Sequence, residues 1–404
     1  MSDQPEGVDS TAVQYEPISV KDLLVETKDT SELLIDLAYS AVLHDSAEVG
    51  REVIELERAM DVLQMRARMS LLLSARNPNE AEQLAPVLGM VAGAEKISDA
   101  AGDIAKVVLD EMGLPEAIRA ALPEAIETVA RGSVAADAAA VDRTLGDVDL
   151  ESETGVRVIA IRRGTDWILN PGPETHLRGD DVVILRGPIG PLGEVHEALT
   201  GEPFEVHVAG EEPVPPDLER AVDSIVLMKD LSELAVDLAY SSVLFDNAEL
   251  AEEVHHLEVE VDALRARFEA WTLQAAAQLE DPVQLRGLLQ LGFAAETISD
   301  AAIEISEGVL RDIEVHPVTQ VAVRESDELM VRVRVEVGDP LAGTAVVEGV
   351  PEAIPSISVL AVRRPEEDWL LMADGTTTLE PGDVVIGKGT RRAIGEFTDL
   401  ATRR

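Results

Sequence analysis

The chain has 404 residues, which predicts two to four domains of ordinary size. It carries 78 acidic and 33 basic residues, a formal net charge of -45, and no cysteine. These values exclude disulfides, thiolate chemistry and general binding to a nucleic-acid backbone, which needs a basic surface. The sequence has no uncharged apolar run long enough for a membrane helix, and its polar N-terminus is unlike a signal peptide. We therefore expect a soluble cytoplasmic protein.

The balance of charged and aromatic residues indicates a habitat. Arginine outnumbers lysine 27 to 6, and aromatic residues make up only 3% of the chain. Many carboxylates with few lysines are typical of a salt-loaded cytoplasm, where carboxylates hold water and ions and salt screens their repulsion. We interpret the acidity as an adaptation to salt rather than as a surface for a basic partner.

The chain repeats itself at an interval of 201 residues. Residues 28–48 and 229–249 are identical at 15 of 21 positions. Three later pairs of segments also match: 94–105 with 295–306, 158–169 with 359–371, and 179–187 with 381–389. The protein is therefore expected to contain one unit of about 200 residues twice. We refer to the two copies as the first and the second repeat.

Each repeat begins with apolar residues at helical spacing. In the first repeat the pattern predicts helices over 31–43, 45–76 and 80–112. The break at Asn77-Pro78-Asn79 is expected because proline disfavours helix in the residue before it. The second repeat predicts helices over 232–242, 246–279 and 282–310. Three long helices joined by short turns predict a helical bundle in each repeat.

Each repeat ends in short strand patterns separated by turn residues. Strands are predicted over 156–161, 182–185, 330–335, 357–362 and 384–386. The fold class expected is multidomain α and α+β, with two three-helix bundles alternating with two small α+β domains. The corresponding domains are a flexible acidic tail (1–17), bundles at 18–125 and 218–315, α+β domains at 126–208 and 316–404, and a linker at 209–217.

Acidic residues recur at a spacing of four on the second and third predicted helices. The third helices carry Glu95-Lys-Ile-Ser-Asp99-Ala-Ala-Gly-Asp103-Ile and Glu296-Thr-Ile-Ser-Asp300-Ala-Ala-Ile-Glu304-Ile. This pattern resembles the E-R-I-x-D-x-A-x-x-I signature of PhoU-type domains, which are three-helix units. The resemblance implies acidic ladders that hold multinuclear iron or zinc clusters. The metal candidates are Glu57, Asp61, Glu95, Asp99, Asp103, Glu258, Asp262, Glu296, Asp300 and Glu304.

This metal assignment has an alternative. Residues four apart lie on one face of a helix, so two facing pairs could converge on a hard cation. Composition alone gives roughly 15 acid-x-x-x-acid pairs, however, so a solvated acidic face is the competing interpretation. The signature arginine is Lys96 or Thr297 here, and the usual histidine is Ala100 or Ala301.

A second possible metal pattern occurs in one repeat only. Glu252 with His255, and Glu253 with His256, have the spacing of di-iron helical bundles. The histidines are not repeated, since residues 54 and 55 of the first repeat are Ile and Glu. We therefore expect no di-iron enzyme.

The strand part of each repeat resembles a second family. The motifs are Thr144-Leu-Gly, Gly155-Val-Arg-Val-Ile-Ala-Ile-Arg162-Arg163 and Gly179-Asp-Asp-Val-Val-Ile, with counterparts at 341–343, 358–364 and 379–386. They resemble the TrkA-C domain, the C-terminal half of the RCK units that gate potassium channels and transporters. The resemblance implies domains that pair and bind small ligands, such as cyclic di-AMP or cations, where they meet.

Two adjacent arginines end an apolar strand in each of these domains. Arginine makes forked, charge-assisted bonds to phosphate. Arg162, Arg163, Arg363 and Arg364 are therefore the candidate ligand-binding residues, with salt bridges to the chain's own carboxylates as the alternative. No NAD or ATP site is assigned, because the Rossmann half of RCK units is absent and the glycines at 187, 190 and 193 lack the G-x-G-x-x-G spacing.

These observations lead to one functional hypothesis. The combination resembles archaeal, haloarchaeal-type proteins that join the two domains. It implies a cytoplasmic regulator that senses a ligand or ion and controls cation transport, with potassium as the expected cargo. We expect a membrane cation transporter or channel as partner, a homo-oligomer, peripheral membrane attachment through the transporter, no membrane insertion and no nucleic acid.

Three alternatives stay open. The PhoU resemblance also fits a regulator of phosphate or magnesium uptake. A metal-dependent enzyme would use the acidic ladders, although no Ser/His/Asp set or other nucleophile motif is present, and no catalytic residue is assigned. A transcriptional regulator would need a basic recognition helix, whereas the predicted helices are acidic.

Overall fold

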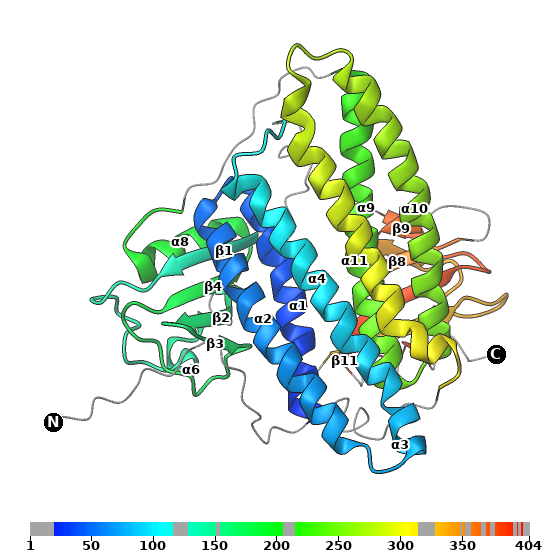
Figure 1. Cartoon of the computed structure of the whole chain (residues 1–404), viewed down its shortest axis with the longest axis horizontal. Coiled ribbons are helices and arrows are strands. Elements are labelled where there is room, and N and C mark those ends of the chain that lie inside the picture. Colours follow the sequence, from blue (N-terminus) through cyan, green and yellow to red (C-terminus); the bar gives the residue numbers. More distant parts are fainter. Residues whose placement is uncertain are drawn as a thin grey trace.

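The computed structural model describes residues 20–115, 128–150, 154–204, 215–313, 328–347, 350–351, 357–364, 369–371, 376–390, 394 and 397–398. Two helical bundles lie side by side at the centre, and each carries a small antiparallel sheet on its outer side (Figure 1). The expected fold class is confirmed, because helical bundles alternate with small sheet domains along the chain.

The first bundle follows the predicted helices closely. It consists of α1 (Val20–Leu43), α2 (Ala47–Ser74), the short α3 (Pro78–Gln83) and α4 (Ala85–Leu109). Ser46 caps α2, since its hydroxyl accepts a hydrogen bond from the Val49 N–H. The predicted break is confirmed. Asn77 caps α3 through its side chain, and Pro78 occupies the first helical turn.

The second bundle repeats this plan. It consists of α9 (Pro216–Phe245), α10 (Ala248–Ala276), a 3-10 turn (Pro282–Leu285) and α11 (Arg286–Leu310). The first helix of each bundle begins well before its predicted start, at Val20 rather than 31 and at Pro216 rather than 232. The Pro-rich segment before residue 217 was interpreted as a linker, so the start of α9 was not predicted. A proline is tolerated in the first turn because the N–H groups there need no helical partner.

The two bundles join through α4 and α11, which run side by side at the centre of the molecule (Figure 1). A Cβ atom at Gly93 would lie 2.4 Å from Ile305 Cγ1, and one at Gly89 would lie 2.8 Å from the Glu304 carbonyl oxygen. Lys96 adds an ion pair to Glu304 across the same contact, at 2.5 Å. The apolar residues of both bundles consequently form one continuous core.

The first sheet comprises β1 (Thr128–Ser133), β2 (Arg157–Arg163), β3 (Asp166–Leu169) and β4 (Val182–Gly187), in the order β1-β4-β2-β3. The second comprises β5 (Glu328–Arg334), β8 (Ile357–Arg363), β9 (Trp369–Leu371) and β11 (Val384–Thr390), in the order β5-β11-β8-β9. Beside it lies a three-stranded sheet of β6 (Ala345–Val347), β7 (Val350–Pro351) and β10 (Thr376–Thr378). Every predicted strand is confirmed.

The first sheet is buried on both faces. Ala160 and Ile184 point to the bundle and belong to its core. On the other face, Val183 and Leu185 pack with Leu192 of α8 (Ile189–Thr200), a helix that the strand analysis did not predict. A short helix, α6 (Leu145–Val148), completes this domain. None of the helices in the described part of the chain is both long and apolar enough to cross a lipid bilayer.

The contact between α4 and α11 predicts the effect of adding a single methyl group. Gly93→Ala should destabilise the protein by about 1–3 kcal/mol, because the new Cβ would overlap Ile305. A solvent-exposed helical Gly→Ala change normally stabilises by about 0.5–1 kcal/mol, and Gly190→Ala in α8 is the matched control, since nothing lies within 4 Å of its Cβ position. Thermal unfolding followed by circular dichroism measures both. A Gly93→Ala protein as stable as the control would show that the helices do not pack this closely.

Candidate functional site

In each repeat the bundle and the sheet meet at a buried glutamate. Glu52 lies on α2 and is 3% exposed. The Arg162 guanidinium, from β2, donates to its carboxylate in a fork, with Nε at 2.5 Å and Nη2 at 2.7 Å. Arg131, from β1, donates from Nε at 3.2 Å. We call this group, a glutamate on the second helix held by two arginines of the sheet, the glutamate clamp.

The second repeat builds the same clamp. Glu253 of α10 is 1% exposed and accepts bonds from Arg363 Nε and Nη2, both at 2.7 Å. Arg332 of β5 donates from Nε at 2.9 Å. All three residues lie 201 positions after their counterparts. The clamp is therefore a feature of the repeating unit rather than of one copy.

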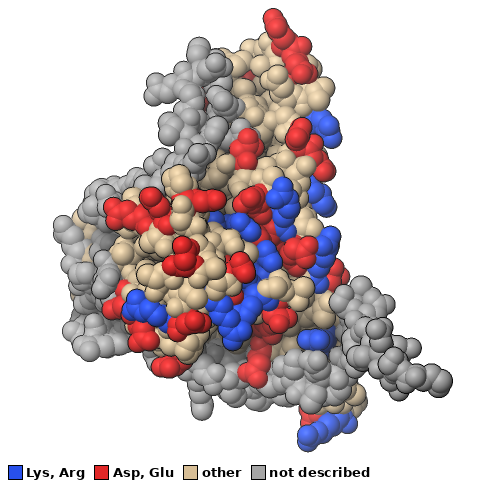
Figure 2. All heavy atoms as spheres, turned by 90° about the vertical axis from the view of Figure 1, so that its left-hand side faces the viewer, with Lys and Arg blue, Asp and Glu red and all other residues tan. Residues whose placement is uncertain are grey.

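An exposed glutamate one helical turn earlier extends each clamp. Glu48 accepts from Arg131 Nη1 at 3.0 Å, and Glu249 accepts from Arg332 Nη1 at 3.1 Å. Each of these sheet arginines thus bridges two carboxylates of the second helix. Carboxylates and basic side chains also interleave on the surface over the first sheet (Figure 2).

The arginines keep the buried carboxylate charged. Burial raises the pKa of Glu253, but the hydrogen bonds from Arg363 and Arg332 outweigh burial and hold the pKa below its usual range. A lone buried carboxylate would be strongly unfavourable, so the two guanidinium groups are what allow Glu253 to sit inside the protein. Separation of sheet and bundle would leave both partners without their bonds.

The second arginine of each pair serves the sheet itself. Arg163 donates in a fork to Asp181, with both bonds at 2.8 Å, and Asp181 is 2% exposed. Burial raises the pKa of Asp181, but the bonds from Arg163 and from the Arg178 N–H outweigh it and lower the pKa. Arg364 holds Asp383 in the same way at 3.1 Å. These pairs fix the turn that precedes the last strand.

All four predicted ligand-binding arginines are therefore bonded to carboxylates of the chain. This is the geometry of the alternative interpretation, and the assignment of a ligand to Arg162, Arg163, Arg363 and Arg364 stays a prediction. The clamp residues Glu52, Arg131 and Arg332 were not predicted, and Glu253 was considered only for its Glu-x-x-His spacing to His256. The signal was present, since each pair is separated by the repeat interval.

The predicted metal residues line the contact between the second and third helices of each bundle. Burial raises the pKa of Glu57, the nearby Lys106 lowers it, and the carboxylates of Asp99, Asp61 and Asp103 raise it, so that the net shift is upward. Burial and Asp262 likewise raise the pKa of Asp300. The two acidic rows therefore face each other, as the spacing predicted.

Other members of these rows are neutralised by ion pairs of the chain. Glu95 pairs with Arg68, Asp103 with Lys106, Glu296 with Arg265, and Glu304 with Lys96. In the described part of the chain no group of three or more His, Asp or Glu side chains is placed to hold a metal ion. Buried Ala100 and Ala301 stand where the signature histidine would be. The metal assignment stays a prediction.

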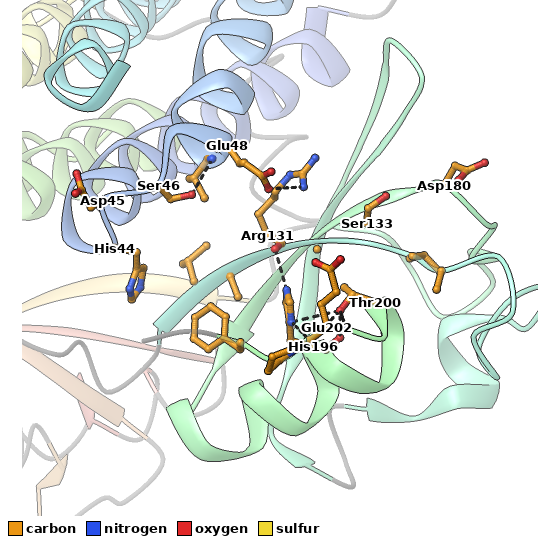
Figure 3. A pocket seen from close by; sticks show the side chains of 18 residues that line it. His44, Asp45, Ser46, Glu48, Arg131, Ser133, Asp180, His196, Thr200 and Glu202 are labelled. Carbon is orange, nitrogen blue, oxygen red and sulfur yellow. Dashed lines mark hydrogen bonds and ion pairs between the residues drawn. The ribbon is translucent and has the colours of Figure 1, made fainter. Parts of the chain in front are cut away.

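A cavity lies beside the clamp of the first repeat (Figure 3). Its volume is about 750 Å³, and it lies between the start of α2, strand β1 and the end of α8. The ring of Phe204 separates two histidines in its wall, with centroids 5.8 Å from His44 and 5.5 Å from His196. The corresponding residues of the second repeat are Phe245 and Thr398. The two histidines of this cavity therefore have no counterparts in the second repeat.

Arg131 connects the cavity to the clamp. Its carbonyl oxygen lies 3.2 Å from His196 Nε2, and its guanidinium bonds to Glu48 (Figure 3). The same guanidinium also bonds to Glu52 of the clamp. The other ring nitrogen, His196 Nδ1, lies 3.1 Å from the Glu202 carbonyl oxygen. A molecule that enters the cavity and moves His196 or Arg131 would therefore act directly on the junction of bundle and sheet.

Two family models match the chain, each of them twice. The PhoU domain matches residues 24–108 and 225–309, and the TrkA-C domain matches residues 129–200 and 330–402. The chain is a tandem of PhoU and TrkA-C domains. Both are families of regulatory domains rather than of enzymes. The expected tandem architecture is thereby confirmed.

Solved structures with detectable similarity include "Crystal Structure of the GsuK RCK domain", at 16% identity and a TM-score of 0.18, covering 69% of this chain and 64% of that one. "GsuK Channel" follows at 16% identity and a TM-score of 0.20, covering 70% and 54%. "GsuK channel bound to NAD" has 15% identity and a TM-score of 0.18, covering 69% and 53%. The chain thus spans between half and two thirds of these structures, and scores this low establish no common overall arrangement. No curated protein matches the chain significantly.

The clamp predicts that neutralising its buried glutamate strongly destabilises the protein. Glu253→Gln should lower the free energy of unfolding of the second repeat by about 3–5 kcal/mol, because two guanidinium groups lose their countercharge in a buried site. Glu249→Gln is the matched control. Its side chain is 68% exposed and shares Arg332, so about 1 kcal/mol or less is expected. Urea unfolding monitored by tryptophan fluorescence measures both, because Trp369 lies against Arg363. Equal effects of the two substitutions would contradict the clamp.

The acidic rows predict a stabilising substitution. Because the pKa of Glu57 is raised in the folded state, its ionisation weakens the fold at pH values above that pKa. Glu57→Gln should therefore raise stability at pH 7.5 by about 0.5 kcal/mol, and the gain should vanish near pH 4, where the wild-type group is protonated. Chemical unfolding at both pH values, with chelator and again with added Fe³⁺ or Zn²⁺, measures this. A metal-dependent loss of stability in the variant would instead support the predicted metal cluster.

Proposed function

We propose that this protein is a cytoplasmic regulator that senses a small ligand or ion through its TrkA-C domains and controls cation transport, with potassium as the cargo. One observation carries the proposal: a cavity adjoins the charged junction through which a sheet domain is held to its helical bundle. Sensing requires a site whose occupancy alters a second surface. Here Arg131 belongs to both the site and the junction.

Coupling of this kind follows ordinary linkage. A ligand shifts a conformational equilibrium only if it binds one arrangement more tightly than the other. A ligand in the cavity that contacts His196 or Arg131 would favour one placement of β1 against α2. Because the two bundles form one core through α4 and α11, a change in one repeat would bear on the other.

The ligand in this proposal is a phosphorylated small molecule, such as cyclic di-AMP, or a cation. The arginines of the clamp support the first choice, since a phosphate could take the place of a clamp carboxylate.

The partner is a membrane cation transporter or channel, and the setting is a salt-loaded cytoplasm of haloarchaeal type. The facing acidic rows favour a second candidate, regulation of phosphate or magnesium uptake, because burial and then the nearby carboxylates raise the pKa of Glu57, and a divalent cation would neutralise those carboxylates.

The test combines a binding and a transport measurement. In cells lacking the gene, ⁸⁶Rb⁺ uptake is measured with the wild-type protein and with the double variant His44→Phe/His196→Thr, which carries the residues of the second repeat. The purified proteins are screened by thermal shift in molar KCl against cyclic di-AMP, and in NaCl against added K⁺. We expect the variant to fold, to lose at least tenfold in ligand affinity and to lose regulated uptake.

Val283→Ala, at a residue 58% exposed in the turn before α11 and outside both clamps, is the control and should leave binding and uptake unchanged. Uptake of ⁸⁶Rb⁺ that is the same with and without the gene would overturn the potassium assignment. A gene-dependent change in phosphate or Mg²⁺ uptake would establish the second candidate. Ligand binding unaffected by the double variant would move the sensing site away from the cavity.

A further inference from the structure

The solvent side of α2 carries a hydrophobic seam that the bundle does not use. Residues spaced alternately by three and four positions along this side are Arg51, Glu55, Arg58, Val62, Met65, Met69 and Leu72. This is the a/d spacing of a coiled-coil seam. Its middle is apolar, and Met65 and Leu72 are 46% and 74% exposed. A helix that already buries its other side in the core rarely needs a second seam of large apolar residues.

The corresponding side of α10 has a matching seam of different character. It consists of Glu252, His256, Val259, Ala263, Ala266, Ala270 and Leu273, all of them exposed. Val259 is 54% and Leu273 71% exposed. Where α2 has two methionines, at 65 and 69, α10 has two alanines, at 266 and 270. Large side chains on one seam thus correspond to open space on the other.

The charges of the two seams are also opposite. The first position is Arg51 on α2 and Glu252 on α10. Arg58 adds a second positive charge to the α2 seam, where it pairs with Glu55 at 2.5 Å, whereas the corresponding position of the α10 seam is the uncharged Val259. In a chain with a net charge of -45, an arginine-bearing apolar seam is the exception. Two copies would repel each other over most of their surfaces and attract where these seams meet.

One molecule cannot join its own seams. α2 and α10 lie on opposite sides of the central α4–α11 pair (Figure 1). We propose that the α2 seam of one copy docks on the α10 seam of a second copy, with the methionines and Leu72 packed over the alanines. Such a contact joins different surfaces, so it is heterologous and links copies head to tail.

Site-specific cross-linking tests this contact directly, because the chain has no cysteine. Leu72→Cys and Leu273→Cys are made singly in the full chain and treated with a bismaleimide in molar KCl. We expect the equimolar mixture to give cross-linked dimer at least tenfold faster than either variant alone. Faster cross-linking of one variant with itself would overturn the pairing of α2 with α10.

A second measurement uses substitutions on exposed positions, where folding is not at risk. Analytical ultracentrifugation should show that the wild type self-associates and that Met65→Glu and Ala266→Glu each weaken association at least tenfold. Mixing the two variants should restore one contact and recover dimers. Val337→Glu, at a residue 90% exposed in the second sheet domain, is the matched control and should change nothing. A wild type that stays monomeric up to 100 µM, or variants that associate like the wild type, would refute the proposal, as would a monomer that binds anionic vesicles through the α2 seam.

Discussion

A charge placed inside a protein must be paired, and this requirement organises the architecture. Glu52 and Glu253 are almost fully buried, and each depends on two arginines from a sheet far along the chain. Removal of either side leaves uncompensated charge, so sheet and bundle are held in one relative placement. Apolar packing alone would bring them together with less directional preference, because burial of hydrophobic area does not depend on orientation. The clamp therefore fixes how each sheet is oriented on its bundle.

Under the proposed function, the same junction would couple a ligand in the adjoining cavity to the placement of sheet and bundle. Arg131 is shared between the clamp and the wall of the cavity, so no separate relay is required. The repeats keep the clamp identical while their nearby residues diverge, as His44 against Phe245 shows. Under the proposed function, one copy of the junction would respond to a ligand while the other would keep its sheet and bundle in a fixed placement. The outer sides of α2 and α10 have diverged in a similar manner.

Periodicity predicted the helices and the strands with strict alternation, and the repeat predicted the architecture. Periodicity did not predict segments whose structure is set by contacts with distant parts of the chain. Residues 128–133, Thr-Val-Ala-Arg-Gly-Ser, lack alternation, yet they form β1 because β4 supplies the ladder. The arginines at 162 and 363 were recognised as special, but not their partners. Glu52 is one of 78 acids, and sequence alone does not show which acid a fold will bury. The faces of the acidic rows were predicted because helical spacing is local, whereas their ion pairs depend on which helices meet.

The contact between α4 and α11 has a consequence for how such a molecule can change. Two separate, identical chains joined by the equivalent contact would carry every substitution twice, once on each side of a symmetry axis. Covalent fusion of the two units removes that coupling. A histidine can then replace a phenylalanine on one side only, and one helix can carry an arginine where its twin carries a glutamate. The duplication thus converts a symmetric pair of units into a molecule whose two sides differ. Selection can then act on each side separately, including on contacts that join unlike sides.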